Sequence, residues 1–178
     1  MKKASLLLLC ALIMGLSACG GKEPAAPSFT DREQREIQLP AKVERIISGS
    51  AAVTEILVEL GLGDKIVAVD MYGTDVAGLP EGAEAVDMFS PNAEQLVSLQ
   101  ADLLIASSMS RQGTDEDPFA VLAETGVCVA YIPTAESLAD IMADVRFIAE
   151  LCGVKERGEA IVARMEAKIA EIREKARQ

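Results

Sequence analysis

Short apolar runs that alternate with amphipathic segments constrain the fold of this chain more than any other feature. The apolar runs lie at residues 43–48, 65–70, 85–87, 103–106 and 127–132, and polar or glycine-containing turn sequences follow them. Between them, segments 51–61 and 137–153 repeat apolar residues at the spacing of a helix with one buried face. This alternation indicates βαβ units. It therefore predicts an α/β fold with a mostly parallel sheet flanked by helices, a Rossmann-like lobe.

Three further helices are expected. Ser90 has the character of an N-cap and Pro91 that of a first helical residue, which would place Glu94 in the first turn of a helix. Residues 118–125 predict a short helix that ends at Gly126. Residues 154–178 predict a long helix, with apolar positions at one helical spacing and a dense set of charges on the other side.

The N-terminal residues 1–18 have the composition of a secretory signal peptide. Lys2 and Lys3 precede an apolar run that is too short to cross a bilayer as a stable helix. The sequence Leu-Ser-Ala-Cys-Gly at 16–20 resembles the lipobox of bacterial lipoproteins, in which the cysteine is acylated. We therefore expect an exported protein that Cys19 anchors to the cell membrane, facing the extracellular or periplasmic side. With Cys19 acylated, residues 19–28 would carry the lipid and form a flexible tether. An ordinary signal peptide with an incidental cysteine is the alternative.

Composition excludes several classes of function. The formal net charge is −11 and no basic stripe is present, so we expect no nucleic-acid partner. Histidine is absent, which removes Ser-His-Asp and Cys-His nucleophile systems and any His-ligated metal site. Cys128 and Cys152 form no CxxC pair, and we expect two buried thiols rather than a disulfide. The chain lacks GxGxxG and GxxxxGK[ST] motifs, so nucleotide binding is disfavoured.

The carboxyl ends of the predicted strands are the expected ligand site, because ligands of parallel sheets bind there. The candidate binding residues at these ends are Ser50, Tyr72, Met88, Phe89 and Arg111. Aromatic and methionine side chains suit a bulky, partly apolar ligand, and an arginine suits an anionic one. Core packing is the alternative for the apolar residues, and a surface charge that offsets nearby aspartates is the alternative for Arg111. Glu94 needs no role beyond a favourable interaction with the helix dipole.

Four segments of the chain resemble a known family. They are RIISGSAAVTEILVELGLGDKIVAVD, EQLVSLQADLLIASS, a Gly-Val-x-Val strand and ESLADIMADVRFIAELCG. Together they resemble the N-terminal lobe of class III periplasmic binding proteins, the substrate-binding lipoproteins of ABC importers for ferric siderophores, cobalamin and haem. The family usually has proline where this chain has Ala101. The resemblance implies that residues 29–153 form the N-terminal lobe and that 154–178 form the long helix connecting two lobes. The second lobe is expected to be missing from this chain.

The resemblance also implies a role for each part of the site. The chain would capture an iron–siderophore or a related chelate and deliver it to the permease, without catalysis, cofactor or protein-bound metal. Corrinoid and haem ligands are the alternatives within the family. Glu94 matches the glutamate that docks onto permease arginines, with Glu55 as the rival position. Other classes of function stay open: an enzyme such as a chelatase or a carboxylate-based hydrolase on a similar lobe, or a surface lipoprotein that takes no part in transport.

Overall fold

A five-stranded parallel sheet forms the centre of the protein, in the spatial order β5-β4-β3-β6-β7. The computed structural model describes residues 28–113 and 116–177. The strands are β3 (Ile46–Gly49), β4 (Ile66–Asp70), β5 (Glu84–Val86), β6 (Leu103–Ser107) and β7 (Cys128–Ile132). The chain moves outward from the central strand β3 to β5, then returns beside β3 as β6 and continues to β7. The predicted α/β fold with a parallel sheet is confirmed.

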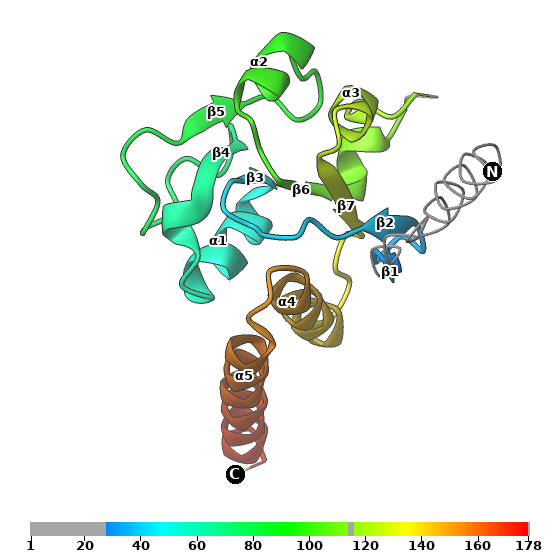
Figure 1. Ribbon diagram of the computed structural model, residues 1–178. Helices are drawn as coiled ribbons and strands as arrows, with labels where there is room; N and C mark the ends of the chain where they lie inside the picture. Colours follow the sequence, from blue (N-terminus) through cyan, green and yellow to red (C-terminus); the bar gives the residue numbers. More distant parts are fainter. Residues whose placement is uncertain (1–27, 114–115, 178) are drawn as a thin grey trace, which may run out of the picture.

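Helices cover both faces of this sheet (Figure 1). One face carries α1 (Ala51–Glu59), α4 (Leu138–Leu151) and α5 (Lys155–Lys175), and the other carries α2 (Ala93–Ser98) and α3 (Ala120–Glu124). Two short 3₁₀ helices, η1 (Gly63–Lys65) and η2 (Ser108–Arg111), precede β4 and follow β6. Strand β6 shows why two cores form: Leu103 and Ile105 join the core cluster of the first face, and Leu104 joins that of the second. Successive side chains of a strand point to opposite faces, so a strand buried on both sides is apolar throughout.

A small antiparallel hairpin lies beside β7. It pairs β1 (Ser28–Thr30) with β2 (Glu36–Gln38). The buried carboxylate of Asp31 holds it in place, since one oxygen accepts from the backbone N–H of Arg35 at 2.8 Å and the other from that of Tyr131 at 3.1 Å. Neither strand was among the predicted elements, and β1 begins at Ser28, the residue where the expected tether ends.

The start of α2 differs from the prediction. Ser90 is not the N-cap; the side chain of Asn92 caps the helix by accepting from the backbone N–H of Gln95 at 2.9 Å. The reason lies upstream, where Asp87 accepts hydrogen bonds from the backbone of Phe89 and Ser90 at 2.9 and 3.2 Å. Those bonds keep the chain in a turn past Ser90, so the helix begins later. Glu94 still lies in the first turn, as predicted.

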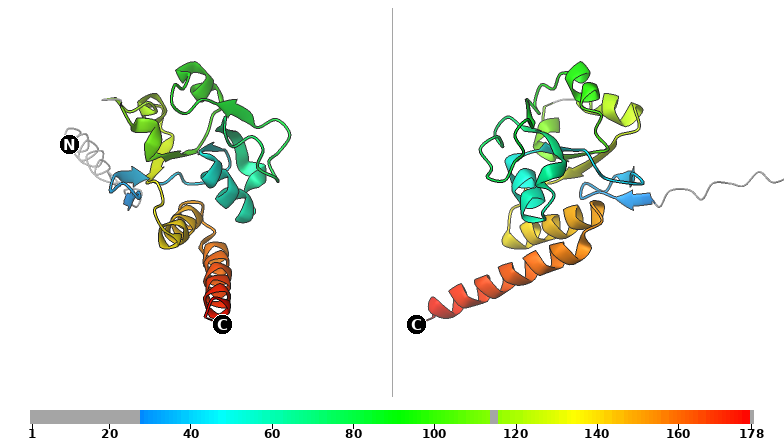
Figure 2. Two further views of the ribbon diagram at one scale, coloured as in Figure 1. Left: turned by 180° about the vertical axis from the view of Figure 1, so that it is seen from behind. Right: turned by 60° about the vertical axis from the view of Figure 1, so that its left-hand side comes forward.

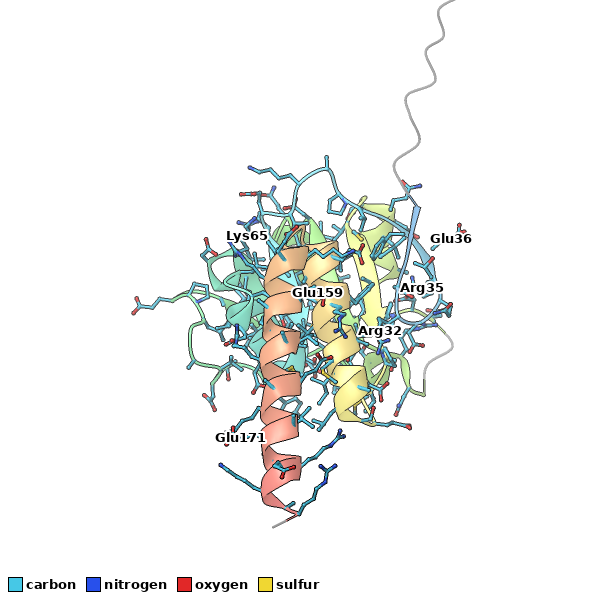
Figure 3. The ribbon with its side chains drawn as sticks, turned by 90° about the horizontal axis from the view of Figure 1, so that it is seen from below. Arg32, Arg35, Glu36, Lys65, Glu159 and Glu171 are labelled. Carbon is cyan, nitrogen blue, oxygen red and sulfur yellow. The ribbon has the colours of Figure 1, made fainter. Side chains whose placement is uncertain are left out.

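The predicted long C-terminal helix is α5, which packs along α4 (Figure 3). Gly158 allows the close approach, because a Cβ there would lie 2.4 Å from the Cβ of Ala149. Beyond that contact α5 projects away from the sheet (Figure 2), and its apolar residue Ile172 is exposed. Within residues 28–113 and 116–177, no helix combines the length and apolarity that crossing a membrane requires. The predicted signal peptide and the acylation site Cys19 lie outside the described residues.

Candidate ligand-binding site

The carboxyl edge of the sheet holds a hollow at the point where the strand order reverses. It has a volume of about 190 Å³ and is lined from β3, β4 and β6 and from the loops that follow β3 to β6. The lining residues are Gly49, Ser50, Ala51, Asp70, Tyr72, Met88, Phe89, Ser107, Met109 and Ser110. Gly49 suits this position because a Cβ there would lie 2.6 Å from the carbonyl oxygen of Ile105 on the neighbouring strand. Ligands of open α/β sheets bind at this reversal, so the hollow is the candidate site.

A polar side chain at or just beyond each of four strand ends fixes the loop that follows. In every case a side-chain oxygen accepts a hydrogen bond from a backbone N–H two or three residues later. The pairs are Ser50 with Val53 at 3.3 Å, Asp70 with Tyr72 at 2.9 Å, Asp87 with Phe89 at 2.9 Å and Ser107 with Met109 at 3.3 Å. These bonds set the direction in which each loop leaves the sheet.

Three of these loops present large apolar side chains to solvent around the hollow. Tyr72 is 73% exposed, Phe89 53% and Met109 42%. Aromatic and thioether groups gathered from separate loops at one edge mark an interaction surface rather than a core. Met88, by contrast, is 1% exposed, so it contributes to the core of the sheet as well as to the lining of the hollow. Ser50 both lines the hollow and caps α1.

A second hollow, of about 320 Å³, continues the site toward β7 and α4. It shares Ser50, Ser107 and Met109 with the first. Its charged lining residue, Asp144, is buried and accepts from Nε of Arg32 at 2.8 Å. Burial raises the pKa of the Asp144 carboxyl, and the bond from Arg32 opposes that rise.

Arg111 lies apart from the other predicted site residues. It is not among the residues that line either hollow, and its guanidinium lies 5.0 Å from the ring centroid of Tyr131. Arg35 lies over the same ring at 4.6 Å, and the Tyr131 hydroxyl donates to Asp117 at 2.6 Å. The ligand contact of Arg111 therefore stays a prediction, while Ser50, Tyr72, Met88 and Phe89 share one hollow.

Sequence reasoning missed Asp70, which ends β4 and lines the first hollow. Asp70 is 5% exposed, and its carboxylate accepts from the backbone N–H of Tyr72. Burial raises its pKa, and the nearby Asp87 raises it further. The signal was available, because an acidic residue that closes an apolar strand at the ligand edge is unusual in a core position.

The two glutamates considered for docking are both exposed. Glu94 stands in the first turn of α2, which follows the carboxyl end of β5, so it lies toward the same edge of the sheet as the hollow. Within the described residues its carboxylate forms no hydrogen bond or ion pair. Glu55 is on α1 and lines a groove with Tyr72 and Asp75.

Neither cysteine in the described part of the chain forms a disulfide. Cys128 is buried and Cys152 is partly buried, and burial raises the pKa of the first thiol to about 11 and of the second to about 12. The thiols are thus poor nucleophiles and poor metal ligands at neutral pH. Residues 28–113 and 116–177 also hold no group of acidic and cysteine side chains placed to bind a metal ion.

Comparison with known proteins gives a consistent set of matches. The sequence profile of the periplasmic binding protein family matches residues 46–178. An uncharacterized ABC transporter substrate-binding lipoprotein of Bacillus subtilis, YvrC, is 29% identical over 187 residues, covering 96% of this chain and 57% of that protein. The vitamin B12-binding protein of Yersinia pestis is 35% identical over 100 residues, covering 53% of this chain and 33% of that protein.

Solved structures resemble the lobe over a similar range. The periplasmic haem-binding protein RhuT of Roseiflexus sp. RS-1 superposes with a TM-score of 0.66 at 32% identity, over 76% of this chain and 51% of that one. The chain thus spans about half the length of RhuT and of the Bacillus subtilis lipoprotein.

Proposed function

The chain belongs to the periplasmic binding protein family, and on that premise we propose that it captures a metal chelate for an ABC importer and delivers it to the permease. The observation that supports this function most directly is the hollow at the sheet reversal, rimmed by the exposed side chains of Tyr72, Phe89 and Met109. A rim of this kind suits a bulky ligand with apolar parts. An iron–siderophore is the proposed ligand, with a corrinoid or haem as the alternative.

The lobe would supply one wall of the binding cleft. The first hollow has about 190 Å³, below the roughly 300–1,000 Å³ of most ligand pockets, so a chelate seated there would stand partly outside it. The family resemblance assigns the opposite wall to a second lobe joined through α5, and we propose residues 154–178 as that connector. Tyr72 and Phe89 would stack on the ligand, Met88 would form the floor, and Ser50 would offer a hydroxyl beside the α1 terminus.

Delivery would use two further positions. The exposed carboxylate of Glu94 would meet an arginine of the permease, since it forms no hydrogen bond or ion pair within the described chain. Acylation of Cys19 would hold the protein close to the membrane, which keeps the captured ligand near the permease.

Capture and delivery require no catalysis, and we propose that the chain is not an enzyme. The named relatives are binding proteins. An enzyme on this lobe would need an acid–base pair without histidine, and Asp70 is the only titratable residue that lines the first hollow apart from Tyr72. Turnover of a bound chelate by the purified chain would contradict this view.

Equilibrium dialysis of the purified full chain tests the function. The probes are a ferric trihydroxamate, cobinamide and haemin, each followed by its visible absorbance. We expect saturable binding of one class in a one-to-one complex, weakened by Tyr72→Ala. Absence of saturable binding for all of them would overturn capture.

A further inference from the structure

We propose that the ligand presents an uncharged or cationic surface to this lobe, and that Asp70 selects against anionic chelates. This inference rests on the proposed capture function and narrows the class of ligand. It is carried by the charges that line the two hollows and by the position of one buried carboxylate.

Neither hollow has a basic lining residue. Their linings contain no lysine or arginine, and their charged members are Asp70 in the first and Asp144 in the second. Asp144 is already matched by Arg32 at 2.8 Å. Sites that hold carboxylates, catecholates or phosphates are built around arginine, lysine or several convergent N–H groups. This wall lacks the side chains that an anionic chelate requires.

Asp70 differs from Asp144 in having no cationic partner among the described residues. Asp70 is only 5% exposed, and its carboxylate accepts from the backbone N–H of Tyr72 at 2.9 Å. A buried carboxylate is normally matched by a cation or by further donors. A ligand that brings a cation or hydrogen-bond donors to the hollow would supply that match, whereas an anionic ligand would add repulsion.

Two features act in the opposite direction, and both are weaker. The N-terminus of α1 adjoins the hollow at Ala51 and carries roughly half a positive charge, one N–H of which is already bonded to Ser50. Arg111 follows the lining residue Ser110, but its guanidinium lies over Tyr131 on the side of β7. The carboxylate of Asp70 belongs to the lining itself, whereas the guanidinium of Arg111 does not.

The proposed binding preference depends on the charge of the chelate and not on its metal. Ferric trihydroxamates that are neutral or cationic, and cationic corrinoids, are compatible with this wall. Ferric catecholates, ferric carboxylates and haem with its propionates are disfavoured. For a charge several ångströms from Asp70 in a partly solvated site, we expect a discrimination of about three- to tenfold.

Three ferric complexes with one coordination core measure the preference. Desferrioxamine B carries a free ammonium group, its N-acetyl derivative is neutral, and its N-succinyl derivative carries a carboxylate. In equilibrium dialysis with the full chain, the cationic and neutral complexes should bind with higher affinity than the anionic complex. Cobinamide, which is cationic, and haemin, which is anionic, provide a second comparison. Anionic probes that bind as tightly as the others, or haemin as the only ligand, would overturn the charge preference and leave capture intact.

Variants then locate the cause. Asp70→Asn keeps an oxygen that can accept from the Tyr72 N–H and removes the charge, so the cationic-to-anionic affinity ratio should fall about three- to tenfold. Asp64→Asn is the control, because Asp64 is an exposed aspartate in η1, before β4, and lines neither hollow. An equal fall in both variants, or none in Asp70→Asn, would contradict the role of Asp70. If none of the five probes binds, capture fails and the charge preference with it.

Discussion

The buried carboxylate of Asp70 accepts a hydrogen bond of 2.9 Å from the backbone N–H of Tyr72, whose ring is exposed to solvent. The bond fixes the loop after β4, so the ring is held outward although no core residue covers it. Asp87 does the same for Phe89. These bonds hold the backbone of two exposed aromatic residues in place at the edge of the sheet, which lowers the ordering cost of binding a ligand.

Replacing Tyr72 by alanine should weaken ligand affinity without loss of stability. An aromatic contact contributes about 0.5–1.5 kcal/mol, equivalent to a two- to twelvefold change in the dissociation constant. Because the ring is exposed, the free energy of unfolding should change little. Equilibrium dialysis and urea unfolding measure the two quantities. Val97→Ala is the control, as Val97 is an exposed apolar residue on α2 that does not line the hollow; equal losses of affinity in both variants would refute the role of the ring.

Replacing Glu94 by glutamine should reduce ligand uptake in cells that carry the permease, while ligand affinity stays unchanged. The carboxylate lies in the first turn of α2, so its removal should also cost about 0.3–1 kcal/mol of stability through the helix dipole. Glu55→Gln is the comparison, since Glu55 is the rival docking position and is also exposed, on α1 at the other face of the sheet. Normal uptake by the Glu94 variant, or a loss of uptake confined to Glu55→Gln, would show that Glu94 is not the docking residue.

Arg32→Met should destabilise the fold in a way that depends on pH. Asp144 is buried on α4, and Arg32, which Figure 3 labels, is its partner at 2.8 Å. Burial raises the pKa of Asp144 and Arg32 opposes the rise, so its removal raises that pKa further. A raised folded-state pKa gives stability that is full below the unfolded pKa and is lost as pH rises through the folded one.

The difference between this variant and the parent chain should therefore be small near pH 3 and reach about 1–3 kcal/mol at neutral pH, less than for a fully buried pair because Arg32 is a quarter exposed. Urea unfolding across this pH range measures it. Lys168→Met, which breaks the exposed pair with Glu171, should change the free energy of unfolding little at any pH in this range. A pH-independent difference for Arg32→Met would show that lost packing, not charge, is responsible.

Burial should protect Cys128 and Cys152 from alkylation. With pKa values of about 11 and about 12, less than about one molecule in a thousand would carry either thiolate at pH 7.5. Peptide mass spectrometry after iodoacetamide treatment should find both unmodified in the native chain and both modified in urea. Rapid native labelling at Cys152 would mean that the end of α4 opens locally.

The elements that could be predicted are those whose signal is local. The apolar run at 103–106 and the helical spacing at 137–153 each correspond to an observed element. A strand buried on both faces is apolar throughout, and a helix buried on one face has apolar residues at helical spacing. Topology alone also predicted that Tyr72 and Phe89 lie at one edge of the sheet, and both line the first hollow.

The features that were missed depend on contacts between distant residues. Strand β1 exists because Asp31 binds the backbone of Tyr131, 100 positions away. The cap at Asn92 depends on which N–H groups Asp87 has already taken. Arg111 follows β6 at the predicted edge of the sheet, but its guanidinium lies over the ring of Tyr131. The sequence does not show that this ring lies beside the loop. The acidic residue Asp70 at the end of an apolar strand was visible in the sequence, but its burial without a cationic partner depends on contacts that the sequence does not show.

Gly158→Ala should destabilise the chain although alanine favours a helix more than glycine does. The propensity gain is about 1 kcal/mol, but the new Cβ would lie 2.4 Å from the Cβ of Ala149 and 3.3 Å from the carbonyl oxygen of Val145. Overpacking of this kind costs about 1–3 kcal/mol, so we expect a net loss at the α4–α5 contact. Urea unfolding of Gly158→Ala, Ala149→Gly and the double variant closes a cycle. If the contact is the cause, Ala149→Gly should recover most of the loss in the double variant, because it removes the atom that the new Cβ would meet. Additive effects of the two substitutions would mean that α5 shifts freely along α4, and its direction would then be set elsewhere.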